Sequence, residues 1–433
     1  MKKRRESLQQ VEQLLQFIND SPSCFHALGN VEKQLEEAGY LRLDEREEWH
    51  LVAGGKYYVD RNGSSCIAFH LPQKEIRGFH LIASHSDSPC FKLKEKPEIR
   101  VEDRYVKLNV EKYGGMILST WLDRPLSVAG RVVVDGFPEP VVKRVNLDRD
   151  LFVIPNLAIH MNPEINKGME YNAQTDMLPL FGGGDCQKSL LKLAAEAVGV
   201  ETGDILGSDL FLYNRQKGGV FGAEEEFIYS PRLDDLECVY CSLQAMLSVK
   251  PDSHANLLVV FDNEEVGSMT RQGAASSFLQ DTLLRICEAL GKNQQDYGRL
   301  LAESFMISAD NAHGVHPNRP EKSDPTNRPY LNGGIVIKYH GGQKYTTDGI
   351  SAAIIKQICQ RAGVSWQTYA NRSDILGGST LGNLSAARVP VRTVDIGFAQ
   401  LAMHSACETA GVQDVADMIK VMEGFYQMPV GRR

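Results

Sequence analysis

The sequence predicts an α/β protein in which a mainly parallel, mixed sheet is covered by helices and interrupted by an inserted β-rich domain, and three observations support this. After Pro231, apolar runs of strand length alternate with amphipathic helical segments, a pattern typical of parallel sheets. Before that point, from about Lys94, short β-like runs are separated by Gly and Pro turns. The chain of 433 residues exceeds the roughly 250–300 residues at which a single core stops growing. We therefore expect three segments: the first part of the helix-covered domain at 1–94, the insert at 95–229, and the second part at 230–433.

The periodicity of the apolar residues sets the expected elements in chain order. Two helices fill the first 40 residues, since apolar residues from Val11 to Ile18 recur at helical spacing and Ser21-Pro22-Ser23 separates the two. Strands are expected at 56–60, 66–70 and 78–84, and in the insert at 105–110, 128–134 and 209–213. Beyond the insert, strands are expected at 257–261, 305–309, 334–338 and 391–395. Helices are expected at 235–249, 274–290, 349–362 and 413–426.

Composition and charge exclude several classes of partner. Hydrophobic residues make up 42% and charged residues 24% of the chain, which is typical of soluble globular proteins. The net charge is −8 and Lys and Arg form no stripe, so nucleic acid is not an expected partner. No apolar stretch approaches the roughly 18 residues of a membrane span, and the basic start leads into a polar helix rather than a signal core. We therefore expect a soluble, cytoplasmic protein that does not contact membranes.

The cysteines are expected to be reduced thiols. Nine of them are scattered along the chain, an odd number that does not suggest a disulfide framework. Cys238 and Cys241 have the spacing of a redox motif or half a zinc site. However, they lie inside the expected helix 235–249, and no second pair follows. The favoured interpretation is two small buried thiols in a helix.

Side chains that bind metals follow the expected strands at the points where the strands end. They are His85 and Asp87 after 78–84, Glu264 and Glu265 after 257–261, Asp310 after 305–309, and His404 after 391–395, while Asp234 immediately precedes the helix 235–249. An isolated Glu-Glu pair is more often a solvated turn. The carboxyl ends of parallel strands, however, meet at one edge of the sheet, so these residues are expected to converge. Imidazoles and carboxylates together suit zinc, manganese or cobalt, and the pattern indicates two ions about 3.5–4 Å apart, as in aminopeptidases.

Five segments carry a resemblance to a known family. They are Ser84-His85-Ser86-Asp87-Ser88-Pro89, Ser230-Pro231-Arg232-Leu233-Asp234, Asp262-Asn263-Glu264-Glu265-Val266-Gly267-Ser268, Ser308-Ala309-Asp310-Asn311-Ala312-His313 and Ala402-Met403-His404-Ser405. In this order, and across nearly the whole chain, the sequence resembles the aspartyl aminopeptidase family of dinuclear zinc metallopeptidases. The resemblance implies a zinc-exopeptidase-like catalytic domain, an inserted dimerisation domain, and two divalent metal ions per subunit.

The resemblance also implies roles for the residues at the strand ends. His85 and His404 would each bind one ion, Asp234 would bridge the two, and Glu265 and Asp310 would complete one site each. Glu264 would be the general base that takes a proton from the metal-bound water. Asp87 would support the site by fixing the orientation of an imidazole. The implied reaction is removal of amino-terminal residues from peptides.

Further residues are implied to act on the substrate. His160, in the segment Ile154-Pro155-Asn156-Leu157-Ala158-Ile159-His160, would reach a neighbouring subunit's active site and stabilise the oxyanion, although an ordinary surface His fits the sequence as well. Lys338 ends an apolar strand and would pair with an acidic side chain of the substrate, with Tyr345 close by; a structural salt bridge is the alternative. His313 and His316 fit either substrate contacts or supporting donors. The family forms tetrahedral dodecamers built from dimers, so we expect a homo-oligomer.

The sequence leaves alternative functions open. Tyr339 follows Lys338 where a small or polar residue is usual in the family, so the strictness of an acidic preference stays undecided. A broad-specificity aminopeptidase or a metal-dependent deacylase would use the same metals. A non-catalytic peptide-binding or cargo protein on this scaffold would lack a ligand or the base, and none is missing here.

Overall fold

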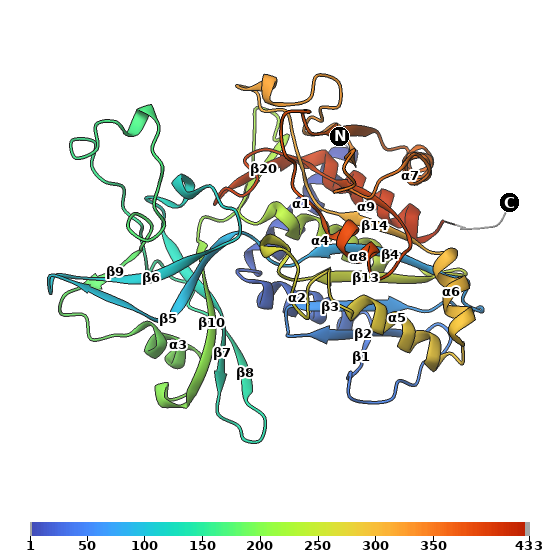
Figure 1. The fold of residues 1–433 in the computed structure, drawn as a ribbon, viewed down its shortest axis with the longest axis horizontal. Coiled ribbons are helices and arrows are strands. Elements are labelled where there is room, and N and C mark those ends of the chain that lie inside the picture. Colours follow the sequence, from blue (N-terminus) through green and yellow to red (C-terminus); the bar gives the residue numbers. More distant parts are fainter. Residues whose placement is uncertain (1, 429–433) are drawn as a thin grey trace.

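The computed structural model describes residues 2–428 and contains two bodies of β-structure that lie side by side (Figure 1). One body is a nine-stranded mixed sheet with helices on both faces, and the other is built on a six-stranded antiparallel sheet. The chain leaves the first body after β4 (Phe79–His85) and has returned to it by α4 (Leu233–Ser248). The six-stranded body therefore interrupts the helix-covered body in sequence.

The nine-stranded sheet places four neighbouring strands in parallel. Its order is β1-β2-β3-β13-β4-β14-β18-β16-β17. The strands besides β4 are β1 Leu41–Arg42, β2 Lys56–Arg61, β3 Ser65–His70, β13 Ala255–Phe261, β14 Phe305–Ala309, β16 Ile335–Tyr339, β17 Trp366–Ala370 and β18 Arg392–Gly397. β4 is parallel to both neighbours, β13 and β14, and β14 is parallel to β18. The carboxyl ends of these four strands consequently lie at the same edge of the sheet.

Helices cover both faces of this sheet (Figure 1). One face carries α1 (Lys2–Asn19), α2 (Cys24–Glu37), α4, α7 (Gly349–Ala362) and α9 (Val412–Tyr426), and the other carries α5 (Phe278–Ala289), α6 (Gln294–Ala302) and α8 (Leu381–Ala386). In β13, Leu258 and Val260 pack into the first core, whereas Leu257 and Val259 pack into the second. Side chains alternate between the faces of a strand, so a continuous apolar run is required where both faces are buried.

The six-stranded body has a separate hydrophobic core. Its sheet has the order β8-β7-β10-β5-β6-β9 and is antiparallel throughout. The strands are β5 Cys90–Val101, β6 Tyr105–Tyr113, β7 Leu126–Val134, β8 Val141–Asn146, β9 Leu180–Gly183 and β10 Ile205–Asn214, and α3 (Leu190–Val198) packs against them. β5 runs through position 95, where the insert is expected to begin.

Short sheets complete the helix-covered body. β11 (Gly219–Phe221), β12 (Phe227–Ser230) and β20 (Glu408–Gly411) form a three-stranded sheet, and β15 (Ala312–His313) pairs with β19 (Ala399–Gln400). The pairing of β12 with β20 links the return of the chain to the segment that follows His404.

The predicted fold class is confirmed, with differences in individual elements. α7 and β14 have the predicted bounds, whereas α5 starts at Phe278 rather than at 274. α3, α6, α8 and β17 were not predicted. α6 contains Gly298, which weakens a helical pattern. Its detectable signal is a capping box, in which the Asn293 side chain accepts hydrogen bonds from the main chain of Gln295 and Asp296.

The predicted state of the cysteines agrees with the structure. All nine cysteines are free thiols, and Cys238 and Cys241 are buried in α4. Within residues 2–428, none of the helices combines the length and the apolar character needed to cross a bilayer.

Two buried imidazoles make the helix-covered body sensitive to acid. His80, near the amino end of β4, stacks on His254 with ring centroids 4.5 Å apart, and both side chains are buried. Burial lowers the pKa of His80 to about 3 and also lowers the pKa of His254. An unfolded His titrates near about 6.5, so below that pH the unfolded chain binds more protons than the folded protein. The stabilisation is therefore complete above about pH 6.5 and decreases as the pH falls toward about 3.

A substitution of His80 tests this pH dependence. Between about pH 7.5 and about pH 5, we expect metal-free His80→Phe to lose about 2 kcal/mol less unfolding free energy than the wild type. Urea unfolding followed by tryptophan fluorescence measures this difference. The control is His50→Phe at an exposed position, which should behave as the wild type does. Equal losses in His80→Phe and the wild type would show that His80 is not a neutral buried imidazole.

Candidate active site

The candidate site lies at the carboxyl edge of the nine-stranded sheet. His85 is the last residue of β4 and pairs with Phe261, the last residue of β13. Asp310 directly follows β14 on the other side of β4. The predicted convergence of these strand ends is therefore observed.

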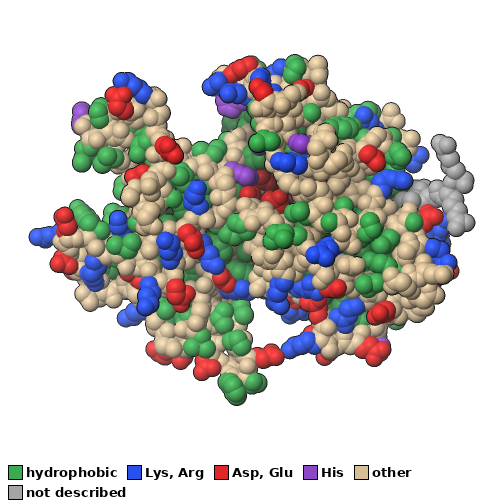
Figure 2. Space-filling view, in the orientation of Figure 1, with side chains coloured by type: hydrophobic (Ala, Val, Ile, Leu, Met, Phe, Trp, Pro, Cys, Tyr) green, Lys and Arg blue, Asp and Glu red, His purple; other side chains and the backbone are tan. Residues whose placement is uncertain are grey.

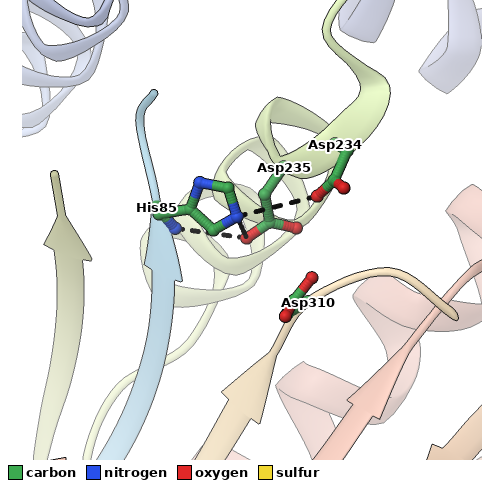
Figure 3. Close-up of side chains that lie close together, drawn as sticks. All are labelled: His85, Asp234, Asp235 and Asp310. Atoms are coloured by element: carbon green, nitrogen blue, oxygen red, sulfur yellow. Dashed lines mark hydrogen bonds and ion pairs between the residues drawn. The ribbon is translucent and has the colours of Figure 1, made fainter. Parts of the chain in front are cut away.

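Asp234 lies between two imidazoles that come from distant parts of the chain. Its Oδ1 is 3.6 Å from Nε2 of His85, and its Oδ2 is 3.5 Å from Nε2 of His404. Nε2 of His404 is also 3.4 Å from Oε1 of Glu265. Asp234 reaches this position because the first turn of α4 is irregular: Asp234 and Asp235 have non-helical backbone angles. Figure 3 shows Asp234, Asp235 and Asp310 around His85.

The geometry of these atoms fits divalent cations. Oδ1 of Asp234 and Oε1 of Glu265 are buried and accept no hydrogen bond from the described residues, which is costly for a carboxylate without a cation. Two donors about 2.0–2.1 Å from one tetrahedral zinc ion lie roughly 3.3–3.4 Å apart, close to the observed separations. Ligand atoms within 4.8 Å of one another form two groups that share Asp234: His85, Asp234, Asp235 and Asp310, and Asp234, Glu265 and His404. The residues present thus suit a pair of ions on either side of Asp234.

Two buried carboxylates support this arrangement and were not among the predicted site residues. Oδ2 of Asp235 accepts a hydrogen bond from the main-chain N–H of His85 at 3.1 Å. Glu408 accepts from the main-chain N–H of Asp234 at 3.1 Å and from that of His404 at 2.8 Å. Burial, together with the nearby Asp234, raises the pKa of Glu408 to about 8. Asp235 was detectable as the second acid of an acidic pair, whereas Glu408 follows no strand-end pattern.

Asp87 connects His85 to the two glutamates. The main-chain N–H groups of Glu264 and Glu265 both donate to its carboxylate, at 3.1 Å each. Nδ1 of His85 hydrogen-bonds to the main-chain carbonyl of Asp87 at 3.1 Å. With Nδ1 carrying the proton, Nε2 of His85 presents its lone pair toward Asp234. The main-chain carbonyl of Asp87 thus orients the imidazole of His85, and the role of the Asp87 side chain in the reaction stays a prediction.

Glu264 lies beside the cluster without belonging to either group that shares Asp234. One of its carboxylate oxygens is within 4.8 Å of ligand atoms of His85 and Glu265. Burial, with the nearby Asp310 and Asp87 carboxylates, raises the pKa of Glu264 to about 8, against the opposing effect of His85. Adjacent divalent cations would lower this pKa. A general base is most effective when its pKa lies near the operating pH.

Lys338 is already paired within the chain. Its Nζ donates to the main-chain carbonyls of Asp310 and Asn311, at 3.0 Å each, and lies 3.4 Å from Oδ2 of Asp310. Burial alone would lower the pKa of Lys338, but the Asp310 carboxylate outweighs burial and raises it. These two carbonyls take two of the three donors of the ammonium, and the Asp310 carboxylate lies within ion-pair distance of it. The structure therefore contains the salt bridge that the sequence left open as the alternative interpretation.

The other predicted substrate residues lie near Lys338. Tyr345 is buried, with its ring centroid 4.9 Å from Nζ of Lys338. His313 is exposed, and its ring lies edge-to-face with that of Tyr369, with the ring centroids 6.1 Å apart. Their roles toward a substrate stay predictions.

His160 is not brought to the cluster within one chain. It is exposed in the segment between Val153 and Leu180, which projects from the six-stranded body (Figure 1). Among residues 2–428, no recorded hydrogen bond or ion pair joins His160 to the cluster. In the space-filling view, acidic side chains line the bottom of a hollow between the two bodies (Figure 2).

The fold and the carboxylate–imidazole cluster define the class of protein as a metal-dependent hydrolase. The sequence profile of the family described as Aminopeptidase I zinc metalloprotease (M18) matches residues 17–426. The "Probable M18 family aminopeptidase 2" of Clostridium acetobutylicum is 46% identical over 434 residues, covering 98% of this chain and 100% of the relative. The protein of the same description from Pseudomonas aeruginosa is 40% identical over 421 residues, covering 95% of this chain and 97% of the relative. The chain belongs to the M18 family and is a metallo-aminopeptidase, which confirms the resemblance noted from the sequence.

Solved structures agree with this assignment. Ape4, in its cryo-EM complex with Nbr1, has a TM-score of 0.94 at 36% identity, with 98% of this chain and 86% of that chain covered. mApe1 of Chaetomium thermophilum has a TM-score of 0.88 at 32% identity, with 98% of both chains covered. The mApe1 dodecamer of S. cerevisiae has a TM-score of 0.83 at 27% identity, with 96% and 95% covered.

Proposed function

We propose that this metallo-aminopeptidase uses two divalent ions per subunit, most readily zinc, with Glu264 as the general base. The observation that carries this proposal is the position of Asp234, whose two carboxylate oxygens face His85 and His404 separately. His85, Asp234 and Asp310 would hold one ion, and Asp234, Glu265 and His404 the other. Manganese and cobalt would satisfy the same donors.

The residues of the site have separate roles in the proposed reaction. Bound divalent cations supply a water of lowered pKa and polarise the peptide carbonyl. Glu264 takes the proton of that water and can return it to the amine that leaves. Asp87 fixes the main chain of Glu264 through its hydrogen bond, so the carboxylate keeps its position during the proton transfer. Asp235 and Glu408 hold the main chain of His85, Asp234 and His404.

We propose amino-terminal Asp and Glu as the preferred substrates, on the basis of the resemblance to aspartyl aminopeptidases. One observation favours a second candidate, a broad-specificity aminopeptidase. Because Lys338 is buried and already paired with the Asp310 carboxylate, an acidic substrate would have to compete with this carboxylate. The two candidates therefore differ in whether Lys338 is released toward the substrate.

A substrate panel distinguishes these candidates. We expect kcat/KM for Asp- and Glu-anilides to exceed that for Leu- and Lys-anilides by about tenfold or more, because only acidic side chains can exchange with the Asp310 carboxylate. Equal values for all four would reject the acidic preference and support the broad enzyme. Cleavage of acylated substrates without a free amine would instead indicate a deacylase, and no turnover of any substrate would indicate a peptide-binding protein.

We further propose a cytoplasmic homo-oligomer, a tetrahedral dodecamer built from dimers, in which His160 serves the active site of a neighbouring subunit. The free thiols are consistent with a reducing compartment. His160 lies on an exposed segment away from its own cluster, and the S. cerevisiae neighbour is a dodecamer. Donation in trans would place its imidazole at the oxyanion.

Mixed oligomers test the role of His160 in trans. His160→Ala and Glu264→Gln subunits should each be nearly inactive alone. Reassembled together, they should regain activity in about a quarter of the sites if dimers form at random, because an intact Glu264 then receives His160 from its partner. The control mixes His160→Ala subunits with subunits that carry both His160→Ala and Glu264→Gln. Neither kind of subunit supplies His160, so no activity should return. An active monomer in sedimentation, or no recovery in the first mixture, would contradict this role.

A further inference from the structure

A short segment of the six-stranded body reaches over the metal-binding cluster. It consists of residues 113–117, which begin with the last residue of β6 and are called here the 113–117 segment. We infer that this segment positions Glu265 and His404, so that the six-stranded body is a structural part of the metal centre and not solely an oligomerisation module. The inference rests on the proposed two-metal function. Three contacts carry it.

The first contact sets the orientation of the His404 ring. Nδ1 of His404 lies 2.9 Å from the main-chain carbonyl oxygen of Gly115, a group that can only accept a hydrogen bond. Nδ1 must therefore carry the proton, and Nε2 presents its lone pair toward Asp234 and Glu265. A protein carbonyl in this position is a common second partner of metal-binding histidines.

The second contact holds the main chain of His404. The N–H of Ile117 donates to the carbonyl of His404 at 2.9 Å, while Glu408 binds its N–H on the other side. His404 has a φ of 65°, in the left-handed region that a non-glycine residue rarely adopts. Such a conformation persists only where its surroundings hold it in place. The 113–117 segment supplies the hydrogen bond to the carbonyl of His404, and Glu408 supplies the one to its N–H.

The third contact is the close approach of Gly114 to Glu265. Gly114 has a φ of +80°, and a Cβ at this position would lie 3.1 Å from Cβ of Glu265 and 3.4 Å from its Oε2. A side chain here would therefore press directly on a proposed metal ligand. Glycine allows the backbone to pack against Glu265 and confine it.

Tyr113 connects the 113–117 segment to Asp87 and Asn263. Its hydroxyl donates to Oδ2 of Asp87 at 2.7 Å and accepts from the Asn263 side chain at 2.8 Å. Asp87 in turn binds the main-chain N–H groups of Glu264 and Glu265. The 113–117 segment therefore confines Glu265 through Gly114 and, by way of Asp87, through Tyr113. It holds His404 through the carbonyl of Gly115 and the N–H of Ile117.

Zinc titrations of Gly114→Ala and Tyr113→Phe test the inference. In competition with a chelator, we expect both variants to bind one of the two zinc ions about 10–100-fold more weakly, the usual effect of losing an outer partner of a ligand. In Gly114→Ala the other ion should keep its wild-type affinity, because within residues 2–428 no hydrogen bond or ion pair joins His85 or Asp310 to the segment. Absorption spectra of cobalt-substituted protein should change at the weakened site, and excess metal should restore kcat.

Matched controls separate this effect from strain and from simple loss of a hydroxyl. Gly199→Ala introduces a Cβ at a φ of +68°, with no described atom within 4 Å. Tyr105→Phe removes a hydroxyl from an exposed position of β6, at the other end of that strand. Both controls should bind two zinc ions as the wild type does.

The outcomes are distinguishable. Wild-type affinities and cobalt spectra in both Gly114→Ala and Tyr113→Phe would overturn the inference, as would an equal weakening of both ions in Gly114→Ala. If Gly114→Ala does not fold, Tyr113→Phe alone decides. A wild-type protein that binds fewer than two ions would instead refute the two-metal function.

Discussion

Replacing Glu264 with Gln is expected to lower kcat by about 100- to 10,000-fold, the usual contribution of a general base. An amide cannot take a proton from the attacking water, although it has nearly the size and shape of the carboxylate. Glu264 is outside both groups that share Asp234, so metal binding should survive. KM should change little, because Glu264 is not proposed to bind the substrate.

The measurement combines steady-state kinetics with metal analysis of the same sample. Glu265→Gln is the contrasting variant: it removes the same chemical group one residue away, but from a proposed ligand. It should lose an ion, and excess zinc should partly restore its activity. Glu264→Gln should keep both ions, and no amount of zinc should restore it. Wild-type turnover by metal-loaded Glu264→Gln would exclude Glu264 as the base.

Replacing Asp234 with Asn is expected to weaken the binding of both ions and to reduce activity to background. Each oxygen of this carboxylate faces a different imidazole, so a neutral amide removes charge from both sites together. Loss of a residue that hydrogen-bonds to a metal ligand weakens metal binding by at most roughly 100-fold. Because Asp234 is itself a proposed ligand, we expect the affinity for each ion to fall by more than that.

The single-site variants provide the comparison for Asp234→Asn. Asp310→Asn should weaken only the ion near His85, and His404→Gln only the ion near Glu265. Equilibrium dialysis in zinc buffers, followed by elemental analysis, counts the ions in each variant. If Asp234→Asn retains one ion with wild-type affinity, Asp234 does not bridge the two sites.

Much of the fold was predictable because strongly periodic segments leave little choice. The run 257–261 is entirely apolar, and such a run fits a strand with both faces covered, which is how β13 packs. α6 was missed because Gly298 and polar residues mask its short apolar stripe. β17 was missed because it is a short strand at the edge of the sheet, where little burial is required of its side chains.

The candidate site, like the fold, was predictable in part. His85, Glu264, Glu265 and Asp310 were candidates because each lies at the end of a buried parallel strand or within a few residues after it, which is a local signal. Glu408 supports the ligands through main-chain hydrogen bonds that follow no local sequence pattern, whereas Asp235 was detectable as the second acid of an acidic pair. Lys338 was recognised from the sequence as a buried cation. Its partner Asp310 follows a different strand, β14, so the pairing could not be predicted locally.

The sequence by itself determined the alternation of the strongly periodic strands and helices, most of the side chains that converge at the candidate site, and the family to which the chain belongs. These properties follow from local periodicity and from motifs of adjacent residues. The tertiary structure alone decided that Asp234 lies between two imidazoles, that Lys338 is paired with Asp310, and that Gly115 orients His404. The last contact joins residues 289 positions apart. Such contacts depend on how separate elements pack in space. Nearly every residue has a main-chain carbonyl and an N–H group, so the residue type does not show which of these groups will form the contact.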